Sequence, residues 1–402
     1  MEVTLTSRQI SVQTVVPDSA VGTAAAPPPD GVLQRALDAP LELPPVNQCV
    51  VPGDRVVIAA DPDAPQVIEA ITEIHHRLCS VPELSISILL PPEFGQPHLT
   101  HLAQEIGQAL ENAVPVEVYD AEDEQQRSYL ASSAAGERIY LARQLVDADL
   151  VITISAAQPD PLVGTTGATA LLYPRFSEPA IIADFRGREL RAWQNAVTGH
   201  AAESASELIE EIGWLLGVQF SVSIVCGPDG TLENVFCGRA DAAVRAAAEY
   251  LQRTRPAVAE DATTDLVVMD VAAVNEVCSW RQFARAVTVG ATLTGYHGRV
   301  VVVCDLEAPD GTAMTALSRT ENPEDLEQPL MLEPPPDAFE ALQLIRCCRD
   351  VRILIRSSLP DAFVEELGMI PISDADEVQR LIDQAESPRV LRSASGTCCW
   401  PA

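Results

Sequence analysis

Short apolar runs alternate with amphipathic segments along the first part of the chain. Apolar runs that predict β-strands lie at residues 55–60, 84–90, 116–119 and 150–154. Between them, apolar residues recur at helical spacing and predict helices over residues 67–78 and 98–110. The alternation continues with a helix predicted over 204–216, strands over 219–226 and 233–237, and a helix over 240–254. Strands that alternate with such helices indicate βαβ units and a parallel sheet, and so a three-layer α/β domain.

A polar segment that contains proline, residues 255–264, predicts a linker to a second α/β unit. That unit is predicted to have strands over residues 266–269, 300–304 and 351–355, and helices over 280–294, 339–347, 362–367 and 374–385. We therefore expect an α/β protein of two Rossmann-like three-layer domains, residues 1–260 and 261–402, with a cleft between them. The alternating residues 2–16 predict a β-hairpin within the first domain. Residues 305–336 are expected to form an excursion at the carboxyl end of a strand, where ligands bind in this architecture.

The charge composition excludes several kinds of chemistry. All 26 basic side chains are arginine, no lysine is present, and the formal net charge of the 402 residues is -32. A phosphate-binding P-loop and a lysine Schiff base both require lysine, so neither is available. The acidity argues against nucleic acid and anionic membranes as partners, because both attract basic surfaces. The first residues lack a basic segment followed by an apolar block, and no run of 18 apolar residues occurs, so a cytoplasmic location is the expectation.

Cysteine and histidine do not form a recognisable metal site. The ten cysteines contain no C-x-x-C spacing and are interpreted as reduced thiols. His75 and His76 are adjacent in a predicted helix, so their rings point apart; His98 and His101 are three residues apart, but a solvated pair at a helix start is favoured. We therefore predict no metal site. The small, hydroxyl-rich segment 164–169 could hold an anion on its backbone amides, although close packing of small residues is the favoured interpretation.

Four segments, taken in order, resemble one known family. They are PGDRVVIAADPDAP from residue 52, DADLVITISAAQPDPLVGTTGATALLYP from residue 147, GPDGTLENVFCGRADAAVRAAAEY from residue 227, and SWRQFARAV followed by YHGRVVVV from residue 279. Their order and spacing are similar to those of the nickel-pincer lactate racemase family. The resemblance extends over nearly the whole chain, and it implies a two-domain α/β protein.

The resemblance also implies a chemistry from which this sequence departs. Members that racemise lactate hold a nickel pincer nucleotide between the domains, tethered to a lysine, with histidines that bind nickel and exchange the substrate proton. The tethering lysine corresponds to Ala170 here. The histidines correspond to Phe94, Asp160 and the neighbourhood of Arg186, and an arginine of the first strand loop corresponds to Ala64.

A few positions of the family pattern are retained. By resemblance, Asp61, Gly164 and Gly167 are candidate cofactor-binding residues. Gln282 and Arg285 stand where the family grips the substrate carboxylate, with arginine in place of lysine. Their i, i+3 spacing in a predicted helix lets both side chains reach one face, and a guanidinium matches the geometry of a small carboxylate.

These departures predict a divergent homologue that is non-catalytic or has an altered function. Covalent attachment of the cofactor is not possible without lysine. The alternative is a racemase or epimerase that acts on a 2-hydroxy acid or sugar acid with a non-covalent cofactor. A plain nucleotide-binding α/β protein is a third hypothesis, which the absence of a glycine-rich fingerprint weakens.

Overall fold

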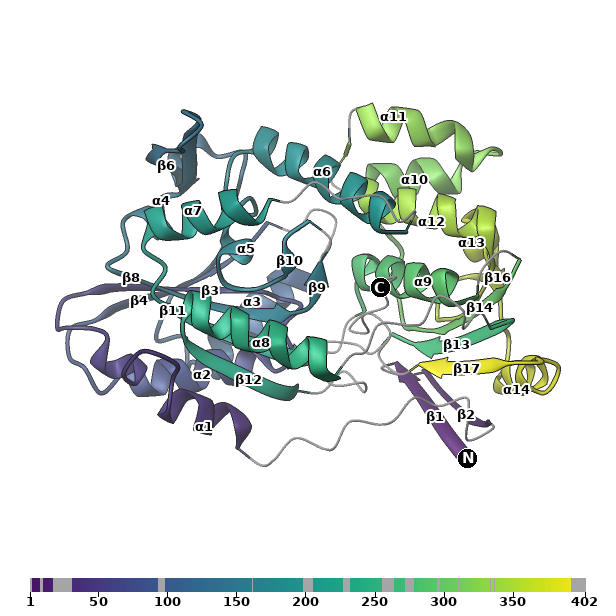
Figure 1. Cartoon of the computed structure of the whole chain (residues 1–402), viewed down its shortest axis with the longest axis horizontal. Helices are drawn as coiled ribbons and strands as arrows, with labels where there is room; N and C mark the ends of the chain where they lie inside the picture. Colours follow the sequence, from purple (N-terminus) through teal and green to yellow (C-terminus); the bar gives the residue numbers. More distant parts are fainter. Residues whose placement is uncertain are drawn as a thin grey trace.

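The chain folds around two separate sheets that lie beside one another (Figure 1). The structure, a computed structural model, describes residues 2–7, 10–16, 31–92, 98–160, 162–197, 205–226, 232–254, 264–271, 278–294, 297–309, 311–332, 334–335 and 337–391. None of the helices in these ranges is long and apolar enough to cross a membrane. The cysteines whose side chains are described are all free thiols.

The N-terminal sheet has six strands in the order β12-β11-β8-β3-β4-β5. They are β3 (Arg55–Ala60), β4 (Ser85–Leu90), β5 (Val116–Val118), β8 (Leu150–Ala157), β11 (Phe220–Cys226) and β12 (Leu232–Arg239). All neighbouring strands are parallel except β12, which is antiparallel to β11. The chain runs from β3 toward β5 on one side and from β8 toward β12 on the other. The crevice between the carboxyl ends of β3 and β8 is therefore the topological switch point, where open α/β sheets bind ligands.

Helices cover both faces of this sheet. One face carries α1 (Val32–Asp38), α2 (Val67–Leu78) and α3 (His98–Ala109), which share a core with the sheet residues that point to that side. The other carries α5 (Ala168–Leu172), α6 (Pro179–Val197) and α8 (Ala240–Thr254), with α7 (Ser206–Leu216) packed on α5. Smaller elements complete this half: η2 (Val46–Gln48), η3 (Glu124–Gln126), the hairpin β6 (Arg127–Ser132) and β7 (Arg138–Ala142), α4 (Arg143–Val146), and the short pair β9 (Pro159–Asp160) and β10 (Gly164–Thr165).

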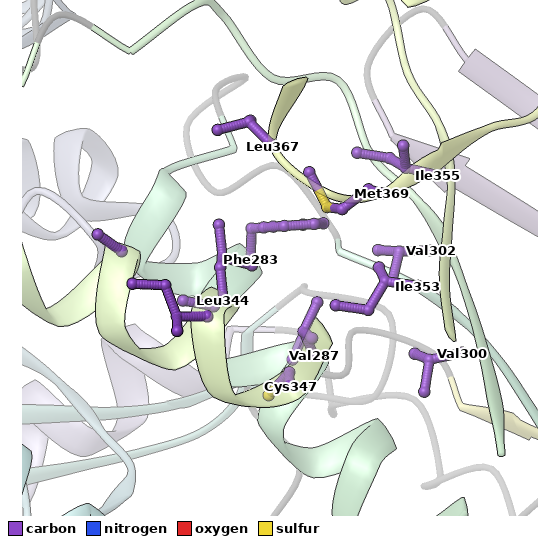
Figure 2. Packing of buried hydrophobic residues seen from close by; sticks show 14 of the residues in the cluster. Phe283, Val287, Val300, Val302, Leu344, Cys347, Ile353, Ile355, Leu367 and Met369 are labelled. Carbon is purple, nitrogen blue, oxygen red and sulfur yellow. The ribbon is translucent and has the colours of Figure 1, made fainter. Parts of the chain in front are cut away.

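The second sheet is parallel throughout, in the order β16-β15-β14-β13-β17. Its strands are β13 (Leu266–Asp270), β14 (Arg299–Val303), β15 (Arg352–Arg356), β16 (Ile370–Pro371) and β17 (Pro388–Leu391). One face packs on α9 (Trp280–Thr294), α10 (Thr312–Ser318), α12 (Ala338–Asp350) and α13 (Asp361–Glu366). Figure 2 shows this core, in which Phe283 and Val287 of α9 face valine and isoleucine side chains of the strands. The fold class predicted from the sequence, an α/β protein with two mainly parallel sheets flanked by helices, is confirmed.

The N-terminal hairpin lies against the second sheet, although the two are far apart in the sequence. Strands β1 (Glu2–Ser7) and β2 (Ile10–Val15) pack with α14 (Ala375–Asp383) on the free face of the second sheet. There Leu5 is fully buried in a cluster with Val268 and Val301. The alternating pattern shows that one face of the hairpin is apolar, but it cannot show which sheet that face covers.

Candidate functional site

A cavity of about 160 Å³ lies between the two halves, at the switch point of the N-terminal sheet. Its floor includes Asp61, directly after β3, and Ala156 and Gln158 at the end of β8. Helices α5 and α6 line it on the N-terminal side, and α9 and α12 on the C-terminal side. This volume is roughly ten times the 10–15 Å³ needed for one water, so a small molecule can be accommodated.

The loop that follows β8 is held rigidly. The Thr166 hydroxyl donates to the carbonyls of Ala156 and Gln158 at 2.9 and 3.1 Å, and it accepts from the Gln158 amide at 2.9 Å. Asp160 Oδ1 accepts from the amides of Leu162 and Val163 at 2.9 and 3.1 Å. These bonds fix one oxygen of Asp160 and leave Oδ2 to face the second domain.

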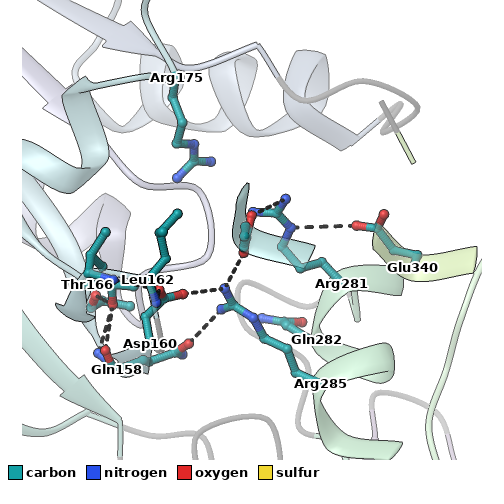
Figure 3. Close-up of polar contacts among 12 residues, drawn as sticks. Gln158, Asp160, Leu162, Thr166, Arg175, Arg281, Gln282, Arg285 and Glu340 are labelled. Atoms are coloured by element: carbon teal, nitrogen blue, oxygen red, sulfur yellow. Dashed lines mark hydrogen bonds and ion pairs between the residues drawn. The ribbon is translucent and has the colours of Figure 1, made fainter. Parts of the chain in front are cut away.

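Arg285 of α9 reaches across the interface into this loop (Figure 3). Its Nη1 donates to Gln158 Oε1 at 3.1 Å, and its Nη2 lies 3.3 Å from Glu189 Oε1 and 3.7 Å from Asp160 Oδ2. Gln158 follows β8 and Glu189 belongs to α6, so two separate segments of the N-terminal half hold one guanidinium of the C-terminal half.

Arg281, one helical turn earlier on α9, joins a second acidic pair. Its Nη2 lies 3.6 Å from Glu189 Oε2, and its Nε lies 3.6 Å from Glu340 Oε1 of α12. The guanidinium also lies over the Phe339 ring, 5.5 Å from the ring centroid. We call Gln158, Asp160, Glu189, Arg281, Arg285 and Glu340 together the interdomain clasp.

The two carboxylates of the clasp that come from the N-terminal half differ in their acidity. Burial and the nearby Glu189 charge raise the pKa of Asp160, and they outweigh the opposing effect of Arg285 and two backbone amides. Burial alone would raise the pKa of Glu189 as well, but Arg281, Arg285 and Arg186 outweigh it and hold that pKa below its usual range. Glu189 is therefore the acidic partner of the arginines, and Asp160 is the carboxyl group that protonates more readily.

The two residues predicted to grip a carboxylate are found in different situations. Arg285 points into the cavity but is engaged by the clasp. Gln282 also lines the cavity, yet its side-chain Oε1 accepts a hydrogen bond from the backbone amide of Ser279 at 3.1 Å. In return, the backbone amide of Gln282 donates to the Ser279 hydroxyl at 3.1 Å. This reciprocal arrangement is a capping box at the start of α9, and the Ser-x-x-Gln spacing was visible in the sequence.

The three residues predicted to bind a cofactor are only partly brought together. Asp61 lines the cavity, where its Oδ1 accepts from Arg175 Nη1 and the Asp63 amide, both at 3.2 Å. Gly167 lines it too, with a φ of +146° and with Val244 3.2 Å from where a Cβ would stand, so glycine is needed there for backbone conformation and packing. Gly164, in β10, is exposed and is not part of the described lining.

The positions at which the sequence departs from the nickel-pincer pattern also face this cavity. Ala170, Arg186 and Asp160 line it, whereas Ala64, in the loop after β3, is fully buried and is not part of the described lining. Phe94 and the side chain of His98 lie outside the described residues. Within the described lining there is no lysine, histidine or cysteine, and no group of three potential metal ligands occurs in the described residues. The residues present therefore do not fit a tethered, nickel-bearing group.

Several residues of the clasp were not found from the sequence. Helix α6 was not predicted, although Ile182, Phe185 and Ala192 recur at helical spacing on its buried side, and it carries Glu189. Glu340 and Arg281 gave no signal, because a charged residue in a helix usually faces solvent. The segment 305–336, expected to border the site, instead forms α10, η4 (Pro323–Leu326) and α11 (Glu327–Leu332), and none of its residues belongs to the described lining.

The fold and the site together define a two-domain α/β protein with a polar cavity at the interdomain switch point. Residues 4–184 match the family model of the lactate racemase N-terminal domain. The structure is similar to that of the lactate racemase apoprotein from Thermoanaerobacterium thermosaccharolyticum, with a TM-score of 0.74 and 15% identity over 99% of this chain and 100% of that one. Residues 4–184 are thus lactate racemase-like in sequence, and the chain as a whole is similar to a lactate racemase in its fold.

A second similar structure is that of a protein from Thermotoga maritima. Its TM-score is 0.66 and its identity 11%, over 88% of this chain and 94% of that one. At these identities the likeness concerns the fold. No curated protein matches the sequence.

Proposed function

We propose that this lactate racemase-like protein does not carry a nickel pincer nucleotide and does not racemise lactate. The observation that carries the proposal is the composition of the cavity wall, which in its described part has no lysine, histidine or cysteine. A covalent amine-derived tether needs a lysine, and the chain has none. Imidazole and thiolate are the protein ligands that suit nickel, and hard carboxylates are poor replacements.

The clasp supports the same proposal. The guanidinium expected to hold a substrate carboxylate is bound by Gln158 and Glu189 of the chain itself. Gln282 uses its side-chain oxygen to cap α9. A protein that retains the scaffold but directs these groups to its own interface functions as a binding or scaffold protein, since function depends on the site and not on the fold.

The test is production of the full chain together with the enzymes that make the nickel pincer nucleotide. We expect no stoichiometric nickel by elemental analysis, no mass increase of the intact polypeptide, and no conversion of L-lactate to D-lactate. The lactate racemase from T. thermosaccharolyticum, produced in the same way, is the matched positive control. Stoichiometric nickel with conversion of lactate would contradict the proposal.

One observation favours a second candidate, an isomerase that acts on a 2-hydroxy acid or sugar acid with a non-covalent cofactor. The buried Asp160 and the half-buried Glu189 lie beside one guanidinium, and their pKa values are shifted in opposite directions. Carboxyl pairs whose pKa values are pushed apart are typical of general acid and base partners. Solvent deuterium incorporation at the α-carbon of lactate or gluconate, absent in Asp160→Asn, would support this candidate; no exchange would dismiss it for these acids.

A further inference from the structure

The cavity has one apolar wall and one charged wall. The apolar wall comes from α5, α6, α7 and the adjoining loops, with Leu171, Tyr173, Ile182, Phe185 and Ile209. The charged wall comes from the domain interface, and Figure 3 shows Arg175, Asp160 and the α9 arginines facing a common space. A ligand with an apolar body and a single polar end matches this division.

The charges of the lining do not favour an anion. Five acidic side chains line the cavity, Asp61, Asp63, Asp160, Glu189 and Glu340, compared with the four arginines Arg175, Arg186, Arg281 and Arg285. The chain as a whole carries a formal charge of -32, so the long-range field has the same sign. Such a field repels anions and concentrates cations near the entrance.

Three arginines of the lining are engaged by carboxylate and amide groups of the chain itself. Arg285 is bound by Glu189 and Gln158, Arg281 by Glu189 and Glu340, and Arg175 by Asp61. An incoming carboxylate has to displace one of these partners and leave it buried without its counter-charge. Breaking a buried pair in this way is strongly unfavourable.

Glu340, in contrast to the arginines, has a carboxylate oxygen that can still accept a hydrogen bond from a ligand. The residue is 8% exposed, and its Oε1 lies near Arg281, but its buried Oε2 accepts no hydrogen bond from any described residue. Glu340 lines the cavity, so a ligand there lies next to this side chain, and a small rotation of the buried carboxylate presents Oε2 to it. A buried carboxylate oxygen requires a donor, and a charged donor gives the strongest bond.

We propose that the cavity binds a small ammonium ligand with an apolar body, with the ammonium group donating to Glu340 and the body packed on the Tyr173 and Phe185 side. The ligand proposal concerns the same cavity as the proposed non-catalytic function, and it rests on the proposed function only in that respect. It replaces the small carboxylate expected at Arg285 and Gln282.

Calorimetric titration of the full chain with three matched probes tests the charge preference. The probes are 3-methylbutylamine, 3-methylbutanol and 3-methylbutanoate at equal ionic strength near neutral pH, where an alkylamine with a pKa of about 10 is protonated. We expect the amine to bind at least about tenfold more tightly than the carboxylate, with the alcohol between them. Equal or tighter binding of the carboxylate, or no binding of the amine, would overturn the proposal.

The variant Glu340→Gln tests the position of the ammonium group. It keeps the shape and an acceptor oxygen but removes the charge. We therefore expect amine binding to weaken about ten- to a hundredfold, while alcohol binding changes by less than about threefold. Glu366→Gln, which removes an exposed charge on α13, is the matched control and should leave amine binding unchanged.

The ligand proposal and the proposed function are contradicted by different results. Amine affinity that is unchanged in Glu340→Gln contradicts the ligand proposal, whatever the nickel assay shows. If Glu340→Gln does not fold, the comparison of the three probes on the wild-type chain still decides the ligand class. Nickel loading with lactate conversion contradicts the proposed function, whatever the calorimetry shows.

Discussion

Replacing Glu189 with alanine should weaken the attachment of the two domains to each other. Glu189 is the central carboxylate of the clasp, 3.3 Å from Arg285 and 3.6 Å from Arg281, and its side chain is 15% exposed. Loss of one partner from a buried ion pair typically costs about 3–5 kcal/mol. Asp160 and Glu340 stay within 3.7 Å of the two arginines and compensate in part, so we expect a loss of about 2–3 kcal/mol.

Urea unfolding measures this loss, with tryptophan fluorescence as the signal because Trp280 is next to Arg281. The matched control is Asp241→Ala, which also removes one negative charge but from an ion pair with Arg239 whose side chains are 50% and 55% exposed. That change should cost less than about 1 kcal/mol. A double-mutant cycle of Glu189→Ala with Arg285→Ala should give a coupling energy of about 1–3 kcal/mol.

A specific result would refute this reasoning. If Glu189→Ala and Asp241→Ala lower the free energy of unfolding equally, the clasp does not contribute to the interface. The same conclusion follows from a coupling energy near zero in the cycle, because the two side chains would then act independently.

Two further predictions concern pH and the N-terminal hairpin. The pKa of Asp160 is higher in the folded than in the unfolded chain, so protonated Asp160 stabilises the fold relative to ionised Asp160. This contribution to stability is complete below the pKa of the unfolded state, and it is lost as the pH rises through the pKa of the folded state. The stability of Asp160→Asn relative to wild type, from urea titrations at several pH values, should therefore increase with pH; a difference that is independent of pH would contradict this. Leu5→Ala should cost about 2–5 kcal/mol, because Leu5 is fully buried. Hydrogen exchange of the Leu5→Ala variant should show reduced amide protection in β13 and β14. Reduced protection in β3 and β8 instead would contradict the position of the hairpin on the second sheet.

The architecture could be predicted from the sequence because it depends on local pattern. Buried parallel strands such as β3 and β8 are continuous apolar runs, and amphipathic helices separate them. The change of sheet near residue 260 coincides with a polar, proline-bearing segment. Arg285, a candidate taken from the family resemblance, lines the cavity.

The clasp could not be predicted because its partners are distant in the sequence. Arg285 is 96 residues from Glu189 and 127 from Gln158, and no local pattern specifies such pairings. The same holds for the hairpin, where the Thr6 amide donates to Asp270 across 264 residues. Gln282 shows a different limit, because a glutamine three residues after a helix-capping serine satisfies a local capping rule and a ligand-binding hypothesis equally well.

The clasp links the ligand preference of the cavity to the positions of the domains. Any anion that takes Arg285 must displace Glu189 or Gln158, which belong to the other half of the molecule, so anion binding requires the interface to open. An ammonium ligand at Glu340 adds a donor to an oxygen that has none among the described residues and leaves every ion pair of the clasp in place. In an acidic chain with no lysine, the arginines of this cavity are enclosed by carboxylates of the chain itself, and an incoming anion has to compete with them. Asp160, which stands where the family has a histidine, belongs to the clasp, so one of the substitutions that remove the family's histidines also supplies a group to the domain interface.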